Sequence, residues 1–160
     1  FSEAIDLLKK TKLMNSIEQV LSKKKSLLAI CLGLQLLFEE SEEFGYSKGI
    51  SFFKGKVQSF ENQKAEKKTF IGWNRVMLKK NENLFKNKNF SKKFDYNSLF
   101  FVHSFFVKSN EKKFEIGTST NGKVNFSSIV KKDNVLACQF HPEKSGIFGL
   151  QFLKNIYIKS

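Results

Sequence analysis

The feature that most constrains the fold is a short apolar run at residues 26–31 that leads directly into a helix-like run at residues 33–40. A continuous apolar run of this length is typical of a strand that is buried on both faces, as strands of parallel sheets are. A strand followed at once by a helix is the repeating unit of α/β domains. We therefore predict an α/β fold in which Cys31 stands at a turn from strand to helix.

The other periodic segments fit this fold. A helix with Ser2 as its cap and a break at residues 10–12 is predicted over residues 2–22. Strands are predicted on both sides of a polar stretch at residues 79–97, over residues 50–60, 69–78, 98–108, 113–119, 124–130 and 135–140. Gly146 leads into a last helix, whose predicted inward residues are Ile147, Leu150, Leu153 and Ile156 or Tyr157. Such a chain should form a mostly parallel sheet with added antiparallel strands.

Composition limits the classes of partner. The 160 residues suffice for one domain with a core, and the net charge of +13 raises the question of nucleic acid. The lysines are scattered in short groups through polar connections, which indicates a solvated surface, although an acidic protein partner or a phosphorylated substrate would also suit them. Two cysteines make no disulfide framework. With no membrane-spanning run or signal peptide, we expect a cytoplasmic protein that binds no nucleic acid, membrane, metal or cofactor.

The sequence allows two interpretations of Cys31, as a buried core thiol or as a nucleophile. A tight turn would push its side chain out of the sheet edge, and the helix that follows would favour the thiolate and offer N–H groups to an oxyanion. Gly33 and Ala29 are small enough for the helix to pack close to the strand. Six residues cannot decide between the two readings, so the rest of the chain must.

A nucleophilic cysteine needs a base, and the sequence has only two histidines. His141 directly follows the strand predicted at residues 135–140, and Glu143 lies two residues later, where it could orient and stabilise the imidazole. Strand ends are also where open α/β sheets carry their sites. His103 lies inside a predicted strand, so we interpret it as a hydrogen-bonded structural residue. Cys138, inside the last strand, is interpreted as core.

Four motifs then identify a family: AICLGLQLLFEESEE at residues 29–43, IGWN at 71–74, FFVHSFF at 100–106 and QFHPEKSG at 139–146. In this order and spacing they resemble the class I glutamine amidotransferases from end to end of the chain. The resemblance implies a flavodoxin-like sheet with helices on both faces. It also implies that residues 1–160 form one amidotransferase domain, incomplete at its N-terminus, whose first strands and oxyanion loop precede Phe1.

The resemblance also implies roles for individual residues. Cys31, His141 and Glu143 would be the triad that hydrolyses glutamine to glutamate and ammonia. The residues that would hold glutamine are Leu32, Gln35, Glu43, Ser104 and Phe105. Those that would contact a partner are Trp73, Asn74 and Lys144. The nearest branch of the family pairs such a glutaminase with a cyclase of histidine biosynthesis, as a heterodimer with an ammonia channel.

The sequence departs from the family pattern just before two of its motifs. Ala29 replaces the usual glycine ahead of the nucleophile, and Thr69 and Phe70 replace a proline and a polar residue ahead of Gly72. The second change keeps open an alternative, a paralogue that supplies ammonia to a synthase modifying a surface-polysaccharide sugar. A non-catalytic basic binding protein is a third reading, which the presence of all three triad residues argues against.

Overall fold

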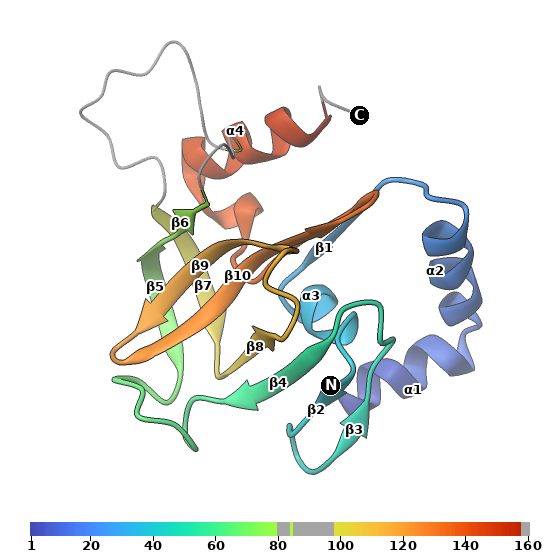
Figure 1. The fold of residues 1–160 in the computed structure, drawn as a ribbon, viewed down its shortest axis with the longest axis horizontal. Coiled ribbons are helices and arrows are strands. Elements are labelled where there is room, and N and C mark those ends of the chain that lie inside the picture. Colours follow the sequence, from blue (N-terminus) through green and yellow to red (C-terminus); the bar gives the residue numbers. More distant parts are fainter. Residues whose placement is uncertain (80–83, 85–97, 158–160) are drawn as a thin grey trace.

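The structure is a computed structural model, which describes residues 1–79, 84 and 98–157 (Figure 1). Most of the polar stretch predicted at residues 79–97 lies outside the described residues, as does the side chain of Tyr157. In the part that is described, no helix is long and apolar enough to cross a membrane.

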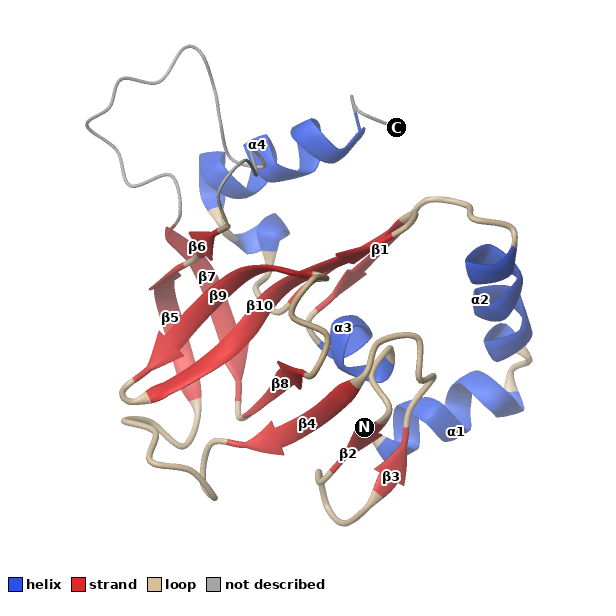
Figure 2. Ribbon diagram, viewed as in Figure 1, coloured by secondary structure: helices blue, strands red, loops and turns tan. Residues whose placement is uncertain are grey.

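Among the described residues, nine strands form a sheet at the centre of the structure (Figure 2). Its strands pair in the order β1-β11-β10-β8-β4-β2-β3, and β9 and β6 extend it from β10. Their bounds are β1 Leu27–Ile30, β2 Glu40–Ser41, β3 Ser47–Lys48, β4 Gly55–Ser59, β6 Met77–Leu78, β8 Phe105–Ser109, β9 Glu115–Asn121, β10 Val124–Lys132 and β11 Val135–Cys138. A separate two-stranded sheet joins β5 (Phe70–Arg75) to β7 (Ser98–His103).

The strand pairs are parallel at two places, between β1 and β11 and between β2 and β4. The other described pairs are antiparallel, including those of β10 with β8, β9 and β11. The parallel share is therefore smaller than predicted, because hairpin-connected strands occupy the middle of the sheet. The strand that carries Cys31 nevertheless has a parallel neighbour, which matters for the site below.

Helices cover both faces of the sheet, as predicted. Along β11, Val135 and Ala137 pack in one core cluster with the first helix, α1 (Ser2–Lys10), whereas Leu136 and Cys138 pack in another with the last helix, α4 (Gly146–Tyr157). This alternation follows from the two-residue period of a strand. Figure 1 shows α4 on one side of the sheet and α1 with α2 (Leu13–Ser22) on the other.

The N-terminal helical segment divides as predicted, but its cap differs. α1 spans Ser2–Lys10 and α2 spans Leu13–Ser22, separated where Lys12 adopts a positive φ of 61°. Ser2 is not a cap: it is the first helical residue, and Phe1 occupies the N-cap position without a side-chain hydrogen bond.

The helix after Cys31 is shorter than predicted. α3 spans Leu32–Leu36, and residues 40 and 41 form β2. The carbonyls of Leu36 and Phe38 accept hydrogen bonds from Ile50 and Ser51. Because residues distant in sequence satisfy these carbonyls, the helix does not continue.

Three predicted strands were too long. The segment at residues 50–60 supplies only β4, and residues 69–78 divide at Val76 into β5 and β6, which join different sheets. Residues 98–108 divide at Ser104 in the same way, into β7 and β8. At Ser104 the chain passes from the small sheet into the main one.

The last helix presents a different face from the predicted one. In α4 (Gly146–Tyr157), Ile147 is 53% exposed and Leu150 is 64% exposed, whereas Phe152 is fully buried. Leu153 and Ile156 pack against the core as predicted. The helix is turned this way because Gly149 packs directly against the backbone of Pro142.

Candidate active site

The site begins where β1 and β11 end side by side. Ile30 pairs with Cys138 in this parallel ladder, and the Cys31 N–H donates to the Cys138 carbonyl at 2.7 Å. The carboxyl ends of parallel strands meet at one edge of a sheet, so the chain beyond each strand enters the same region. Cys31 from one strand and the segment leading to His141 from the other are thereby brought together.

Cys31 occupies a strained turn. Its backbone dihedral angles are φ 51° and ψ −107°, a conformation that non-glycine residues seldom adopt and that costs about 1–3 kcal/mol. α3 starts at the next residue. The partly buried Sγ atom lies 3.9 Å from the Val102 carbonyl and 3.6 Å from Nε2 of Gln139. Strain of this kind is typical of a nucleophile at a strand-to-helix turn.

The thiol of Cys31 is less acidic than the sequence predicted. Burial raises its pKa above the ordinary value, and this effect outweighs the hydrogen bonds from the Leu32 N–H and the Gln139 side chain, which lower the pKa. The negative charge of Glu143 raises the pKa further, whereas the positive charge of Lys144 opposes it. Cys31 is therefore a protonated thiol at neutral pH, and a nucleophile there needs a base.

The predicted base and its carboxylate partner follow the neighbouring strand, β11. The Nδ1 atom of His141 is 2.7 Å from Oε1 of Glu143, as the spacing predicted. The geometry between them differs from the predicted extended chain, since Pro142–Lys144 form a turn of 3-10 helix. The His141 side chain is 18% exposed and the Glu143 side chain 49% exposed, so the pair faces an accessible space.

The predicted glutamine-binding residues fall into two groups. Gln35 is buried, and its Nε2 donates to the Phe105 carbonyl at 2.9 Å and to Oε1 of Gln139 at 3.3 Å. Leu32 is 39% exposed at the start of α3. These three residues, Leu32, Gln35 and Phe105, thus lie around Cys31, directly or through Gln139.

The other two predicted residues have contacts of their own. Ser104 shares a hydrogen bond of 2.8 Å with the hydroxyl of Thr69. The Glu43 N–H donates to the Ser41 hydroxyl at 3.1 Å. In the part of the chain that is described, neither contact joins these residues to the triad.

Gln139 is a site residue that the sequence analysis missed. It is fully buried, it donates to Cys31 Sγ, and it accepts a hydrogen bond from Gln35. The sequence pattern could have identified Gln139, because it is the one polar residue between a buried strand and His141. A buried amide at the end of such a strand needs a polar partner, and here that partner is the site.

The second histidine is structural, as predicted. His103 is only 6% exposed, and its Nδ1 lies 2.8 Å from the Phe105 carbonyl. The rings of Phe60, Phe101 and Phe126 surround it, and burial lowers its pKa to about 4. His103 is therefore neutral at physiological pH. Cys138 is likewise a fully buried core residue.

The predicted partner residues are at least partly exposed. Trp73 is 54% exposed and makes an edge contact with the Phe100 ring at 6.1 Å. It stands in β5, within the strand predicted at residues 69–78, and Ile71 in the same strand is 61% exposed. Asn74 donates to the Thr120 carbonyl, and Lys144 belongs to the exposed turn after His141.

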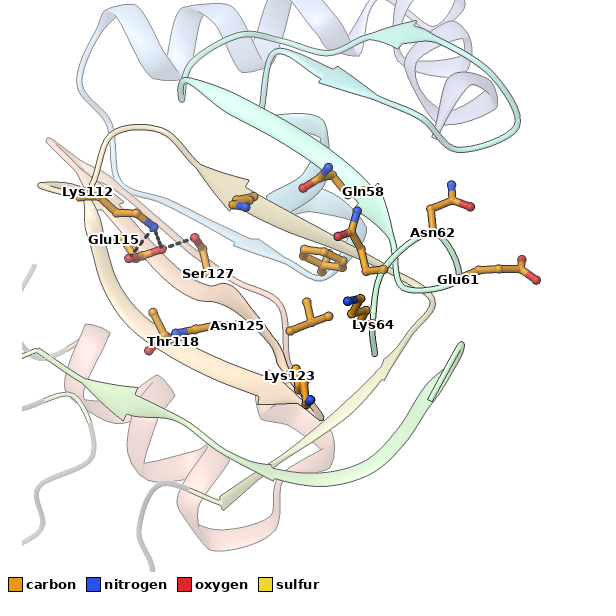
Figure 3. A pocket seen from close by; sticks show the side chains of 14 residues that line it. Gln58, Glu61, Asn62, Lys64, Lys112, Glu115, Thr118, Lys123, Asn125 and Ser127 are labelled. Carbon is orange, nitrogen blue, oxygen red and sulfur yellow. Dashed lines mark hydrogen bonds and ion pairs between the residues drawn. The ribbon is translucent and has the colours of Figure 1, made fainter. Parts of the chain in front are cut away.

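A separate cavity of about 860 Å³ opens over β4, β8, β9 and β10 (Figure 3). Its charged lining consists of Glu61, Lys64, Lys108, Lys112, Glu115 and Lys123. The buried Glu115 carboxylate accepts hydrogen bonds from the Lys112 ammonium and the Ser127 hydroxyl. Among the described residues, no member of the predicted triad lines this cavity, so it is distinct from the candidate active site.

Comparison with known proteins agrees with the geometry. The family Glutamine amidotransferase class-I matches residues 8–160. The Imidazole glycerol phosphate synthase subunit HisH of Caldanaerobacter subterraneus subsp. tengcongensis is 43% identical over 97% of this chain and 72% of its own length. The subunit of the same name from Buchnera aphidicola subsp. Acyrthosiphon pisum is 41% identical over 96% of this chain and 72% of its own.

Solved structures agree on the fold. PurLQS from Thermotoga maritima superposes with a TM-score of 0.64 at 19% identity, covering 92% of this chain and 68% of that one. A glutamine amidotransferase from Thermotoga maritima gives a TM-score of 0.55 at 18% identity, covering 99% of this chain and 57% of that one. With the family match over most of its length and close relatives over nearly all of it, the chain belongs to the class I glutamine amidotransferase family.

Proposed function

We propose that this chain is the glutaminase subunit of imidazole glycerol phosphate synthase, an enzyme of histidine biosynthesis, and that Cys31, His141 and Glu143 are its catalytic triad. The observation that supports the proposal is the parallel pairing of β1 with β11, whose carboxyl ends lead to Cys31 and to the His141–Glu143 pair, in a chain 43% identical to a HisH subunit. An acyl transfer from an amide needs a nucleophile, a base and a group that orients the base.

In the first half of the reaction, His141 takes the proton of the Cys31 thiol as Sγ attacks the side-chain carbonyl carbon of glutamine. The thiol needs this help because burial raises its pKa. The Leu32 N–H, which points at Cys31, stabilises the oxyanion that forms. His141 then gives the proton to the amide nitrogen, the carbon–nitrogen bond breaks, and ammonia leaves a glutamyl thioester on Cys31.

In the second half, water replaces ammonia. His141 takes a proton from the water as its oxygen attacks the thioester carbonyl, and returns that proton to the sulfur as glutamate leaves. Glu143 stays ionised and stabilises the imidazolium in both halves, through the 2.7 Å contact with Nδ1. The Gln35 side chain donates to Gln139 and to the Phe105 carbonyl, and so holds both groups in place near the nucleophile.

The relatives are named as subunits of a synthase, and a cyclase subunit is the partner we propose for this chain. The surface suited to it includes Ile71 and Trp73 on β5, and Ile147 and Leu150 on α4, all more than half exposed. Apolar side chains exposed together next to a site are typical of a protein interface. A partner seated there would receive ammonia through a channel that starts at Cys31, with Asn74 and Lys144 at the rim of the contact.

The test is glutamate release from glutamine by the full-length protein, alone and with the cyclase subunit and its phosphoribosyl substrate. Strong stimulation by the cyclase, lost in Cys31→Ala, is the expected result. Activity that depends on Cys31 but ignores this cyclase would move the protein to a paralogue that feeds a sugar-modifying synthase. Complete inactivity of the wild type in both conditions would overturn the proposal.

A further inference from the structure

One edge of β7 contacts both the proposed nucleophile, Cys31, and the proposed base, His141. In an antiparallel pair, the N–H and C=O groups of a residue point to the same edge of its strand, and residues two apart share that edge. The Phe100 carbonyl accepts the His141 N–H at 2.8 Å, and the Val102 carbonyl lies 3.9 Å from Cys31 Sγ. The opposite edge of β7 pairs with β5. Base and nucleophile are therefore set against the same stretch of backbone.

Ser145 completes the attachment of His141 to this edge. Its hydroxyl donates to the His141 carbonyl at 2.6 Å and accepts the Phe100 N–H at 2.9 Å. Both backbone polar groups of His141 are thus tied to Phe100, one directly and one through the serine. Ser145 is fully buried, so water cannot replace the hydroxyl without a rearrangement.

We propose that Ser145 is a positioning residue for catalysis, which holds the peptide of His141 on the same edge of β7 that contacts Cys31. The inference rests on the proposed function, because it concerns how the proposed base is placed. It assigns no chemical step to Ser145 itself. Glu143 orients the ring of His141, whereas Ser145 sets where the ring is attached. A serine that served only to fold the turn before α4 would affect stability and leave turnover unchanged.

Removing the hydroxyl has a defined consequence. In Ser145→Ala, the Phe100 N–H and the His141 carbonyl lose their shared partner. Among the described contacts, the direct His141–Phe100 bond is then the link from His141 to β7, although the His141 carbonyl still accepts the Lys144 N–H at 3.0 Å within the turn. A shift of the base by about 1 Å lowers turnover on the order of 100-fold. Glutamine contacts other groups, so we expect kcat to fall roughly 10- to 100-fold while KM changes by less than about two-fold.

The experiment measures kcat and KM for glutamine in the full-length protein with its cyclase partner. Ser119→Ala is the matched control, because Ser119 is equally buried, lies in β9, and has a hydroxyl with no hydrogen-bond partner among the described residues. Alkylation of Cys138, which is fully buried in the wild type, reports whether each variant is folded. If Ser145→Ala does not fold, Ser145→Cys takes its place, since it keeps a weak donor and acceptor at the same atom.

A loss of kcat at constant KM in a folded Ser145 variant, with Ser119→Ala unchanged, is the expected result. A folded Ser145 variant with the kcat of the wild type would overturn the inference and leave the proposed function intact. A wild type without Cys31-dependent activity would overturn both, and the two failures are therefore distinguishable.

Discussion

His141 and Glu143 are held together by a 2.7 Å contact between Nδ1 and Oε1 that spans the turn Pro142–Lys144. Because Nδ1 faces the carboxylate, Nε2 is the nitrogen available for proton exchange with Cys31 and substrate. The contact therefore sets both the tautomer of the ring and the direction in which it works.

Replacing Glu143 with glutamine tests this relationship. Glu143→Gln keeps an oxygen for Nδ1–H but removes the negative charge that stabilises the imidazolium. We expect kcat to fall by roughly 10- to 1,000-fold with little change in KM. Steady-state glutaminase assays measure the effect, with Glu61→Gln as the control because that exposed carboxylate pairs only with Lys68 among the described residues. Equal activity of the two variants would show that Glu143 has no role in turnover.

The buried His103 predicts a loss of stability in acid. Its pKa of about 4 in the folded chain lies below the ordinary 6.5, so the unfolded chain binds the proton first as pH falls. The stabilisation is complete above pH 6.5 and is lost progressively down to pH 4, and it amounts to about 3 kcal/mol. Urea unfolding at several pH values measures it. In His103→Phe, which cannot titrate, the decline between pH 6.5 and 4 should be smaller by this amount. Parallel curves for the two proteins would contradict the prediction.

Gly149 predicts a mutation that damages stability and activity together. A Cβ atom at this position would lie 1.8 Å from the Pro142 carbonyl oxygen, which belongs to the turn between His141 and Glu143. Gly149→Ala must therefore move the helix or the turn. We expect a loss of about 1–3 kcal/mol in the free energy of unfolding, together with a lower kcat. Leu150→Ala, on the exposed side of the same helix, should change stability by no more than about 0.5 kcal/mol. Thermal melts and glutaminase assays separate the two, and an unaffected Gly149→Ala would refute the close packing.

Trp73 provides both a probe and a test of the partner surface. It is the only tryptophan in the sequence and is 54% exposed, so its emission should shift to shorter wavelength when the cyclase covers it. Trp73→Ala should weaken cyclase binding about 10- to 100-fold. Tyr46→Ala is the control, because Tyr46 is 69% exposed in the turn between β2 and β3. Titration calorimetry measures both variants, and equal affinities would place the interface elsewhere.

The residues proposed as the triad could be located in the sequence because each stands next to a clear local pattern. Cys31 ends a continuous apolar strand, and His141 follows another. Their joint role came from the family resemblance, whereas the pairing of the two strands was not predicted and is given by the structure. Periodicity failed at Val76 and Ser104, where apolar runs continue while the strand changes sheets. The apolar residues on the two sides of Ser104 look alike because β7 and β8 both bury side chains, although they belong to different sheets.

Other errors arose where apolar residues lie on the surface or polar ones lie inside. Ile147 and Leu150 fit a helical stripe yet are exposed, since the spacing of apolar residues does not indicate what covers them. Gln139 is fully buried and was missed for the opposite reason. The acidity of Cys31 was also misjudged: the expected helix start was right, but only the structure gives the burial that outweighs it.

The pairing of β1 with β11 also determines when, during synthesis of the chain, the candidate site can form. Cys31 and His141 lie 110 residues apart in the sequence, and each follows one of these two strands. A ribosome therefore releases the proposed nucleophile well before the proposed base. A nascent chain that stops before Val135 carries Cys31 without His141 and lacks the strand that pairs with β1. On the proposed mechanism, glutamine hydrolysis can start only after β11 has been synthesised and has paired with β1.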